Sequence, residues 1–348
     1  MHCSLCGVGK YCSMRRNDYE IAMNVSPIPA ALDGHFANLT NFLLDGRVIP
    51  FLGAGVNQFH RPAGSVWHSD KCDYLPDGSE LSRHLASTFS CPSSEIADLL
   101  RVSEYVALTS GSGALYRELH DLFNRDYPPT ALHTFFATWP SLLREKGYPP
   151  KYQLIVTTNY DDLLERAFRE AGEPFDLVIY LAEGSNRGKF LHVAPNGRAQ
   201  IIDAPNRYRD LSLDDRSVIL KIHGAVDRSS PDGEDDSFVI TEDHYIEYLT
   251  RTDLATLVPI TLAAKLRRSH FLFLGYSLRD WNLRVILHRI AGAQSLTYKS
   301  WAVQLSPTEL DQKFWGRRDV DVLDMPLERY VGALRGRAQL LRAAEQIA

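Results

Sequence analysis

Four short apolar segments of this chain each run into a glycine-rich or polar turn, and this repeated pattern restricts the folds open to it. Each apolar segment is rich in strand-forming residues and too short for a helix, so each predicts a buried strand. The turns that follow them are Gly53–Asn57, Thr157–Asp161, Lys221–Gly224 and Gly275–Asn282. Helical patterns lie between the strands, and strands that alternate with helices form parallel sheets through right-handed crossovers. The sequence therefore predicts an α/β fold.

The remaining stretches divide the chain into parts. Residues 1–30 end in the breaker-rich Ser26–Pro29 and are expected to form an N-terminal tail. Residues 31–348 are expected to form one domain, a Rossmann-like parallel sheet flanked by helices. Residues 57–150 open with a polar stretch and continue with helical patterns, which predicts a mostly helical insertion or subdomain. One of these patterns predicts a helix over Ala131–Lys146.

The charge balance excludes several classes of protein. The chain has 38 basic and 43 acidic residues, a formal net charge of −5 and a pI of about 6.2. Non-specific binding to nucleic acid needs a field of basic residues that displaces counterions from phosphates, so we expect no direct nucleic-acid binding. No apolar run approaches the ~20 residues that cross a bilayer, and the N-terminus lacks the apolar core of a signal peptide. We therefore expect a globular cytoplasmic protein that does not bind membranes.

The five cysteines are Cys3, Cys6, Cys12, Cys72 and Cys91. An odd number of cysteines in a chain without an export signal indicates reduced thiols. Together with His2, the first three have the ligand types of a tetrahedral zinc site. They lie at the extreme terminus and no second CxxC follows, so we favour the interpretation without a metal. The sequence alone does not decide between these two interpretations, nor whether translation begins at Met14 or Met23.

The first two turns carry groups suited to a ligand. In open parallel sheets, ligands bind beyond the carboxyl ends of the strands, where these turns are expected to lie. Gly53 and Gly55 allow the backbone to approach a diphosphate and offer it N–H groups, although many strand-to-turn junctions need glycines for backbone reasons alone. Asn159 and Asp161 either face a ligand or cap the helix that follows them.

The last two turns allow the same two interpretations. His223 follows an apolar strand and precedes a glycine, where a histidine is either catalytic or bonded to a backbone carbonyl. Gly275 and Ser277 suit close contact with a phosphate or a ribose, and Asp280 can accept hydrogen bonds from ribose hydroxyls. Alternatively, Ser277 or Asp280 caps the next helix.

Taken in this order, the four turns resemble the Sir2 family. The matching residues are Gly53-Ala54-Gly55, Thr157-Asn159-Asp161, His223-Gly224 and Gly275-Ser277. The segments FLGAGVN, TTNYDDLLE, LKIHG and FLGYSLRDWN are most similar to the Sir2-like branch found in bacterial anti-phage defence, which uses the fold to destroy NAD+. The resemblance covers about residues 45–305. The two CxxC pairs of protein-deacylating sirtuins are absent after the HG pair, and Gln58–Pro62 replaces their proline–aspartate–phenylalanine–arginine loop, which argues against recognition of acyl-lysine.

The resemblance implies an NAD+ glycohydrolase that releases nicotinamide and ADP-ribose, as an NAD-depleting effector of anti-phage defence by abortive infection. It implies that Asn159 orients the ribose hydroxyls or the attacking water, and that Asp161 accepts from the nicotinamide carboxamide. His223 would be the general base, with an imidazole pKa near its ordinary value of 6.5. The residues expected to bind NAD+ are Gly53, Ala54, Gly55, Asn57, Thr158, Gly275, Ser277 and Asp280. NAD+ is then the substrate, and no metal is expected.

Such an enzyme needs control, because unregulated loss of NAD+ kills the host. Little chain follows the last predicted strand, so we expect control by self-assembly into a homo-oligomer or by a partner in trans. In similar defence systems that partner is a HerA-like ATPase or a short Argonaute protein. Two other functions stay open: a non-catalytic module that binds NAD+ or ADP-ribose, and an NAD-dependent protein deacylase. The sequence does not reveal the trigger, the partner, the number of subunits or the role of residues 57–150.

Overall fold

The computed structural model describes residues 30–59, 61–62, 64–70, 73–92, 98–250, 257–277 and 298–341 of the chain. Residues 1–29, which make up nearly all of the expected N-terminal tail and include its three cysteines, lie outside the described residues, and so does Asp280.

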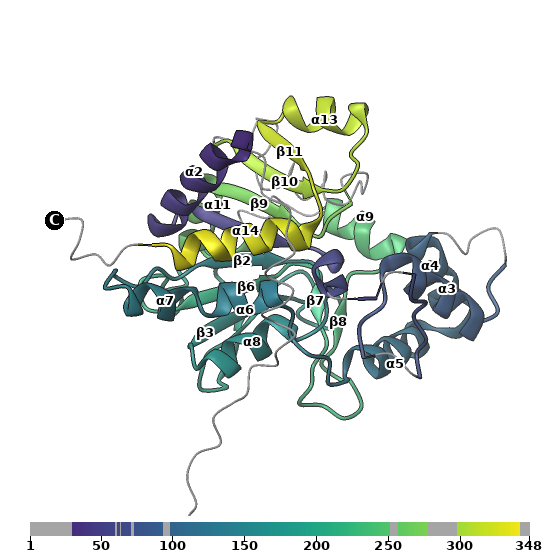
Figure 1. Ribbon diagram of the computed structural model, residues 1–348. Coiled ribbons are helices and arrows are strands. Elements are labelled where there is room, and N and C mark those ends of the chain that lie inside the picture. Colours follow the sequence, from purple (N-terminus) through teal and green to yellow (C-terminus); the bar gives the residue numbers. More distant parts are fainter. Residues whose placement is uncertain are drawn as a thin grey trace, which may run out of the picture.

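A nine-stranded sheet forms the centre of the fold, in the order β11-β10-β9-β1-β2-β6-β3-β4-β5 (Figure 1). Neighbouring strands from β11 to β3 are parallel, and β4 and β5 extend the sheet as an antiparallel hairpin. The strands are β1 (Val48–Leu52), β2 (Leu154–Thr157), β3 (Phe175–Tyr180), β4 (Phe190–Val193), β5 (Ala199–Ile202), β6 (Ser217–Lys221), β9 (His270–Leu274), β10 (Ser300–Gln304) and β11 (Val320–Asp324). This arrangement confirms the predicted α/β class with a Rossmann-like, mostly parallel sheet.

The path of the chain through the sheet reverses at β1. From β1 the chain builds β2, β3 and β6 on one side and then crosses back to build β9, β10 and β11 on the other side. In doubly wound sheets such a reversal opens a crevice beyond the carboxyl ends of the central strands, because the flanking connections leave in opposite directions. The topology therefore places a ligand site above the ends of β1, β2 and β9.

Helices cover both faces of the sheet. Alternate residues of a strand point to opposite faces, so Val48 and Leu52 pack on one face and Ile49 and Phe51 on the other. The first face is covered by α2 (Asp33–Leu44), α6 (Ala131–Ala137), α7 (Trp139–Glu145), α8 (Leu163–Ala171) and α14 (Leu327–Gln339). The second face packs against α9 (Glu242–Thr250), α11 (Ile260–Arg267) and α13 (Glu309–Gly316). In the described part of the chain, no helix has both the length and the apolar character needed to span a bilayer.

A second group of helices has its own hydrophobic core. Helices α3 (Gly78–Thr88), α4 (Leu99–Ser110) and α5 (Ser112–Phe123) lie together beside the sheet, next to the small ribbon of β7 (Gly224–Ala225) and β8 (Ser237–Phe238) (Figure 1). Their apolar side chains pack mainly on each other and on Phe238 and Ile240. We refer to α3, α4 and α5 as the helical subdomain. It accounts for the first part of residues 57–150, whereas α6 and α7 pack on the sheet.

The helix expected over Ala131–Lys146 is instead two helices, α6 and α7, which meet at Thr138. Pro140 lies in the first turn of α7. Proline has no N–H to donate, and its ring collides with the carbonyl four residues earlier, so a continuous helix cannot pass through this position. The apolar spacing of this segment is helical throughout, but the proline divides it into two helices.

Candidate functional site

The four central strands end in one row. Leu52 of β1 lies opposite Thr157 of β2 and Leu274 of β9, and Thr157 lies opposite Lys221 of β6. Because all four strands are parallel, the turns that follow them leave the sheet at the same edge. The register therefore brings together four segments that are separated by up to about two hundred residues of sequence.

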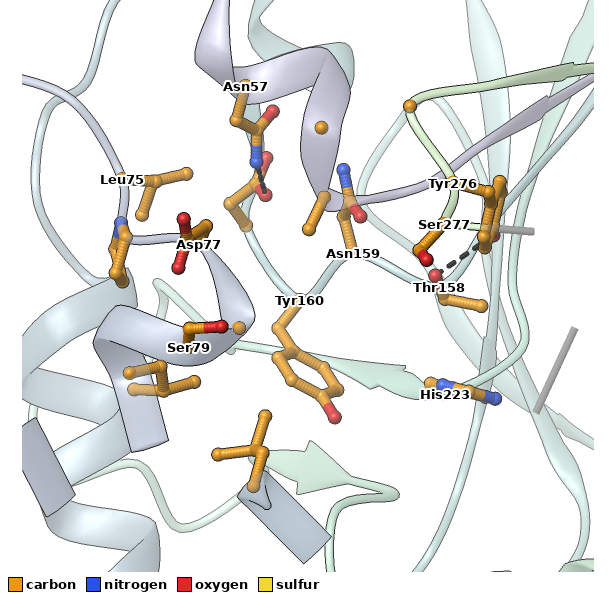
Figure 2. Close-up of a pocket in the computed structure, with 18 of the residues that line it drawn as sticks. Asn57, Leu75, Asp77, Ser79, Thr158, Asn159, Tyr160, His223, Tyr276 and Ser277 are labelled. Carbon is orange, nitrogen blue, oxygen red and sulfur yellow. Dashed lines mark hydrogen bonds between the residues drawn. The ribbon is translucent and has the colours of Figure 1, made fainter. Parts of the chain in front are cut away.

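A cavity of about 1110 Å³ lies above this edge (Figure 2). Its volume lies just above the ~300–1,000 Å³ typical of small-molecule sites. The residues predicted from the sequence that line it are Ala54, Gly55, Asn57, Thr158, Asn159, Asp161, His223, Gly275 and Ser277. Gly53 is not among its lining residues, but its carbonyl oxygen accepts a hydrogen bond from Asn159 Nδ2 at 3.3 Å.

The glycines of the first and fourth turns pack backbone against backbone. Gly55 N–H donates to the Gly275 carbonyl oxygen at 2.9 Å, and Gly53 N–H donates to the Leu274 carbonyl oxygen at 3.0 Å. Gly275 has a φ of +73°, and a Cβ there would lie 2.4 Å from the backbone nitrogen of Val56. Two N–H groups of the Gly53–Gly55 turn are thus occupied within the protein. The remaining N–H group of this turn, that of Ala54, lies at the exposed start of the short 3₁₀ helix η2 (Ala54–Gln58).

Asn159 and Asp161 are buried, and hydrogen bonds fix both side chains. Asn159 Nδ2 is held by the Gly53 carbonyl, which leaves the amide oxygen of Asn159 to a ligand. Asp161 Oδ2 accepts from Asn57 Nδ2 at 2.8 Å, and Asp161 Oδ1 accepts from the Leu163 N–H at 3.1 Å. Asp161 therefore helps to start α8 and also lines the cavity, so the capping and ligand-binding interpretations are compatible.

His223 is buried between the sheet and α9. Its Nδ1 lies 3.3 Å from the hydroxyl of Tyr245, and the two rings meet edge to face. Burial lowers the pKa of His223 to about 3, well below the ordinary value of 6.5 that we assumed from the sequence. The imidazole is therefore neutral at physiological pH. It can accept a hydrogen bond from a hydroxyl or a water, but it is a weaker base than the sequence suggested.

Sequence reasoning did not single out two tyrosines that line the cavity. The Tyr276 hydroxyl lies 2.9 Å from Thr158 Oγ1 and donates to the Leu52 carbonyl oxygen at 3.1 Å, so it joins the turns after β2 and β9. Tyr276 directly follows Gly275, and this position in the fourth turn is the sequence signal that could have identified it as a lining residue. Tyr245 lies on α9, in the long crossover between β6 and β9, and nothing in its surrounding sequence marks it.

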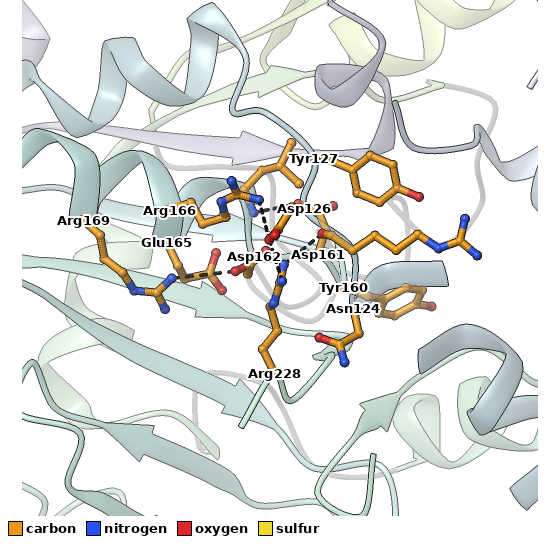
Figure 3. Close-up of polar contacts among 12 residues, drawn as sticks. Asn124, Asp126, Tyr127, Tyr160, Asp161, Asp162, Glu165, Arg166, Arg169 and Arg228 are labelled. Carbon is orange, nitrogen blue, oxygen red and sulfur yellow. Dashed lines mark hydrogen bonds and ion pairs between the residues drawn. The ribbon is translucent and has the colours of Figure 1, made fainter. Parts of the chain in front are cut away.

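Beneath the cavity, the turn after β2 rests on a buried ion pair. Lys221 Nζ lies 2.8 Å from Glu165 Oε1 and donates to the backbone carbonyl oxygens of Tyr160 and Asp161. Burial raises the pKa of Glu165, and the neighbouring ammonium of Lys221 opposes that rise. A second ion-pair network lies at the start of α8, where Arg228 bridges Asp162 and Asp126 (Figure 3). Both sets of contacts hold the backbone that carries Asn159 and Asp161.

No group of three or more His, Cys, Asp or Glu side chains suited to a metal ion is present among the described residues.

Comparisons with known proteins agree with this geometry. Residues 153–323 match the family model of the SIR2-like domain, which confirms the resemblance to the Sir2 family. The matched segment covers just under half of the chain, and β1 with its glycine turn, which precedes that segment, belongs to the same sheet.

Three curated proteins are similar to the chain. It is 28% identical over 242 residues to the NAD(+) hydrolase ThsA of Acinetobacter baumannii, covering 69% of this chain and 38% of that protein. It is 29% identical over 213 residues to the NAD(+) hydrolase ThsA of Enterococcus faecium, covering 61% and 36%. It is 21% identical over 280 residues to Defense-associated sirtuin 2 of Bacillus subtilis, covering 79% and 22%. The aligned part of the chain therefore spans little more than a third of the first two proteins.

Proposed function

We propose that this chain is an NAD+ glycohydrolase that releases nicotinamide and ADP-ribose. The observation that carries the proposal is the meeting of Asn159, Asp161 and His223, from the ends of two neighbouring strands, around one cavity of about 1110 Å³. The similarity to two proteins named NAD(+) hydrolase supports the same substrate.

The reaction breaks the bond between the anomeric carbon of the ribose and the nicotinamide nitrogen. The bonding electrons leave with nicotinamide, and the ribose develops oxocarbenium character. The oxygen of a water molecule then bonds to the anomeric carbon and releases a proton to the solvent. An enzyme accelerates this reaction by holding the dinucleotide in a reactive geometry and placing polar groups where charge develops. The side chains at the end of β2 and β6 are arranged for this task.

Each of the three residues has a proposed role that follows from its contacts. Asp161, which Asn57 and the start of α8 fix in place, accepts from the nicotinamide carboxamide. Asn159 presents its amide oxygen to a ribose hydroxyl or to the attacking water. His223, kept neutral by burial, accepts a hydrogen bond from the same hydroxyl or water and orients it. Ala54 N–H binds the diphosphate, while Gly53, Gly55 and Gly275 give its turn the required shape.

The test is incubation of the purified protein with NAD+ and chromatographic analysis of nicotinamide and ADP-ribose. We expect wild-type protein to release both, and Asn159→Ala and His223→Ala to lower the rate by about 10²-fold or more, as is typical for loss of groups that contact the reacting atoms. Thermal unfolding of each variant checks that the fold survives. Asn196→Ala and His84→Gln change the same residue types away from the cavity and serve as matched controls.

Other outcomes point to other functions. Tight binding of ADP-ribose without release of nicotinamide identifies a non-catalytic binding module. Release of nicotinamide only when an acetylated peptide is present identifies a protein deacylase. Full activity of both alanine variants overturns the roles assigned to Asn159 and His223.

We further propose that the cellular role is depletion of NAD+ during phage infection. The name of the relative from Bacillus subtilis supports a place in defence. Cells that express the chain with its neighbouring genes should lose NAD+ after infection, and cells with the His223→Ala variant should not. Measurement of activity against protein concentration tests whether a homo-oligomer is the active form.

A further inference from the structure

The cavity wall is acidic. Its charged lining residues in the described part of the chain are Asp77, Asp98, Asp161 and Glu328, and neither lysine nor arginine is present in that part of the lining. The histidine that lines it, His223, is neutral because burial lowers its pKa to about 3. The acidic lining in the described part of the cavity favours ligands that carry positive charge where they meet the carboxylates.

Asp77 is the acidic residue that the helical subdomain places beside the predicted site residues. It precedes α3, and its half-buried carboxylate is turned toward the space that Asn57 and Tyr160 also face (Figure 2). Asp77 Oδ1 accepts from the Glu80 N–H at 2.7 Å, and the Asp77 N–H donates to Glu80 Oε2 at 3.0 Å. This reciprocal capping box fixes the carboxylate at the cavity wall.

Arg61 donates hydrogen bonds to Glu80 rather than to Asp77, and the charge of Asp77 acts on its guanidinium only through space. Both terminal nitrogens of Arg61 donate to the carboxylate of Glu80. Burial opposes the charge on Glu80, but hydrogen bonds from Arg61 and from the N–H groups of Asp77 and Trp67 lower its pKa to about 2. Arg61 therefore forms its ion pair with Glu80, and the carboxylate of Asp77 both caps α3 and lines the cavity.

We propose that Asp77 is a specificity residue that selects the oxidised, cationic nicotinamide ring over its reduced, neutral form. This inference rests on the proposed function, because it assumes that the dinucleotide lies with its nicotinamide near Asp161. NAD+ carries a positive charge on this ring and NADH does not, while the rest of the two molecules is the same. A carboxylate facing the ring therefore discriminates between them by charge alone.

The test compares two ligands that are not turned over. Carba-NAD+ keeps the cationic ring but has carbon in place of the ribose ring oxygen, so its glycosidic bond survives, and NADH supplies the neutral ring. Titration calorimetry gives the dissociation constant of each. We expect wild-type protein to prefer carba-NAD+, and Asp77→Asn to reduce that preference by on the order of tenfold, the effect of one charge about 6 Å away at an effective dielectric constant of about 40.

Asp77→Asn removes the charge of the side chain but keeps the cap of α3, because asparagine caps a helix about as well as aspartate. Asp77→Ala, which removes the cap as well, should also lower the melting temperature. Asp203→Asn removes one exposed carboxylate far from the cavity lining and controls for net charge. An unchanged preference in Asp77→Asn overturns this inference and leaves the proposed function intact. Failure of wild-type protein to bind either dinucleotide overturns the proposed function, and this inference with it.

Discussion

Gly184 and Gly275 have nearly the same backbone conformation in very different surroundings. Their φ angles are +74° and +73°, but a Cβ on Gly184 meets no atom within 4 Å, whereas one on Gly275 lies 2.4 Å from the Val56 nitrogen. A substitution at Gly184 therefore measures the free-energy cost of a left-handed backbone alone. The same substitution at Gly275 adds the cost of breaking a backbone contact. The packing of the turns after β1 and β9 therefore requires a glycine at position 275, whether or not a ligand binds.

We expect Gly184→Ala to lower the free energy of unfolding by about 1–2 kcal/mol, the cost of a positive φ for an L-residue. Gly275→Ala should lower it by about 4 kcal/mol, because it must also separate the turns after β1 and β9. Urea unfolding of both variants measures the difference. Equal losses in the two variants would show that the contact between these turns does not contribute to stability.

Among the described residues, hydrogen bonds that are fully buried join two tyrosine–histidine pairs, one of which lines the cavity. Tyr245 lies 3.3 Å from His223 Nδ1, and Tyr208 lies 2.6 Å from His192 Nδ1, far along the sheet in β4. We expect Tyr245→Phe to slow nicotinamide release by about tenfold, because the His223 ring loses the hydrogen bond that fixes its orientation. The rate constant kcat should change more than KM.

Tyr208→Phe is the matched control for this prediction. It removes the same kind of hydrogen bond and should cost stability of the same order, about 1 kcal/mol, without slowing release. Equal rates in the two variants would show that Tyr245 does not act through His223.

At the scale of the elements, the buried pair of Lys221 and Glu165 joins β6 to α8. Glu165→Gln leaves the ammonium of Lys221 buried without its counter-charge, and we expect a loss of about 3–5 kcal/mol in the free energy of unfolding. The double variant Lys221→Met, Glu165→Leu should recover much of this stability, since apolar residues of similar volume tolerate burial.

Activity should not recover in the double variant. Its methionine cannot donate to the carbonyls of Tyr160 and Asp161, so the turn after β2 loses its support. Denaturation curves and nicotinamide release, measured side by side, separate the two effects. Recovery of full activity with stability would show that Lys221 contributes to folding alone.

Sequence patterns predicted the elements that lie in the parallel sheet and the convergence of their turns. The prediction succeeded there because buried strands are continuous apolar runs, and the carboxyl ends of parallel strands must share an edge. It could not identify Asp77, whose position depends on how the helical subdomain packs against the sheet. Nor could it foresee the low pKa of His223, which comes from burial by α9, an element distant in sequence.

At the scale of the whole molecule, buried histidines make stability depend on pH. Burial lowers the pKa of His133 to about 4 and that of His223 to about 3, from 6.5. Below pH 6.5 the unfolded chain binds protons that the folded chain does not, so stability is present above pH 6.5 and is lost as the pH falls toward the folded values. The loss is about 1.4 kcal/mol per pH unit for each histidine.

Between pH 7.5 and pH 5 these two residues should together remove about 4 kcal/mol from the free energy of unfolding. Urea midpoints at the two pH values measure this change. The variant His133→Gln, which keeps an acceptor for the Thr130 N–H, should reduce the change by about 2 kcal/mol. An unchanged slope in that variant would contradict the assignment.

The hydrophobic core of the helical subdomain is separate from the cores on the two faces of the sheet, yet Asp77, which caps its first helix, and Ser79 within that helix form part of the cavity wall. Regions with few contacts to the main core open at lower free energy than the whole molecule. Gentle warming should therefore detach one wall of the cavity while the sheet stays folded. The proposed release of nicotinamide should then be lost several degrees before the sheet unfolds, and should return on cooling.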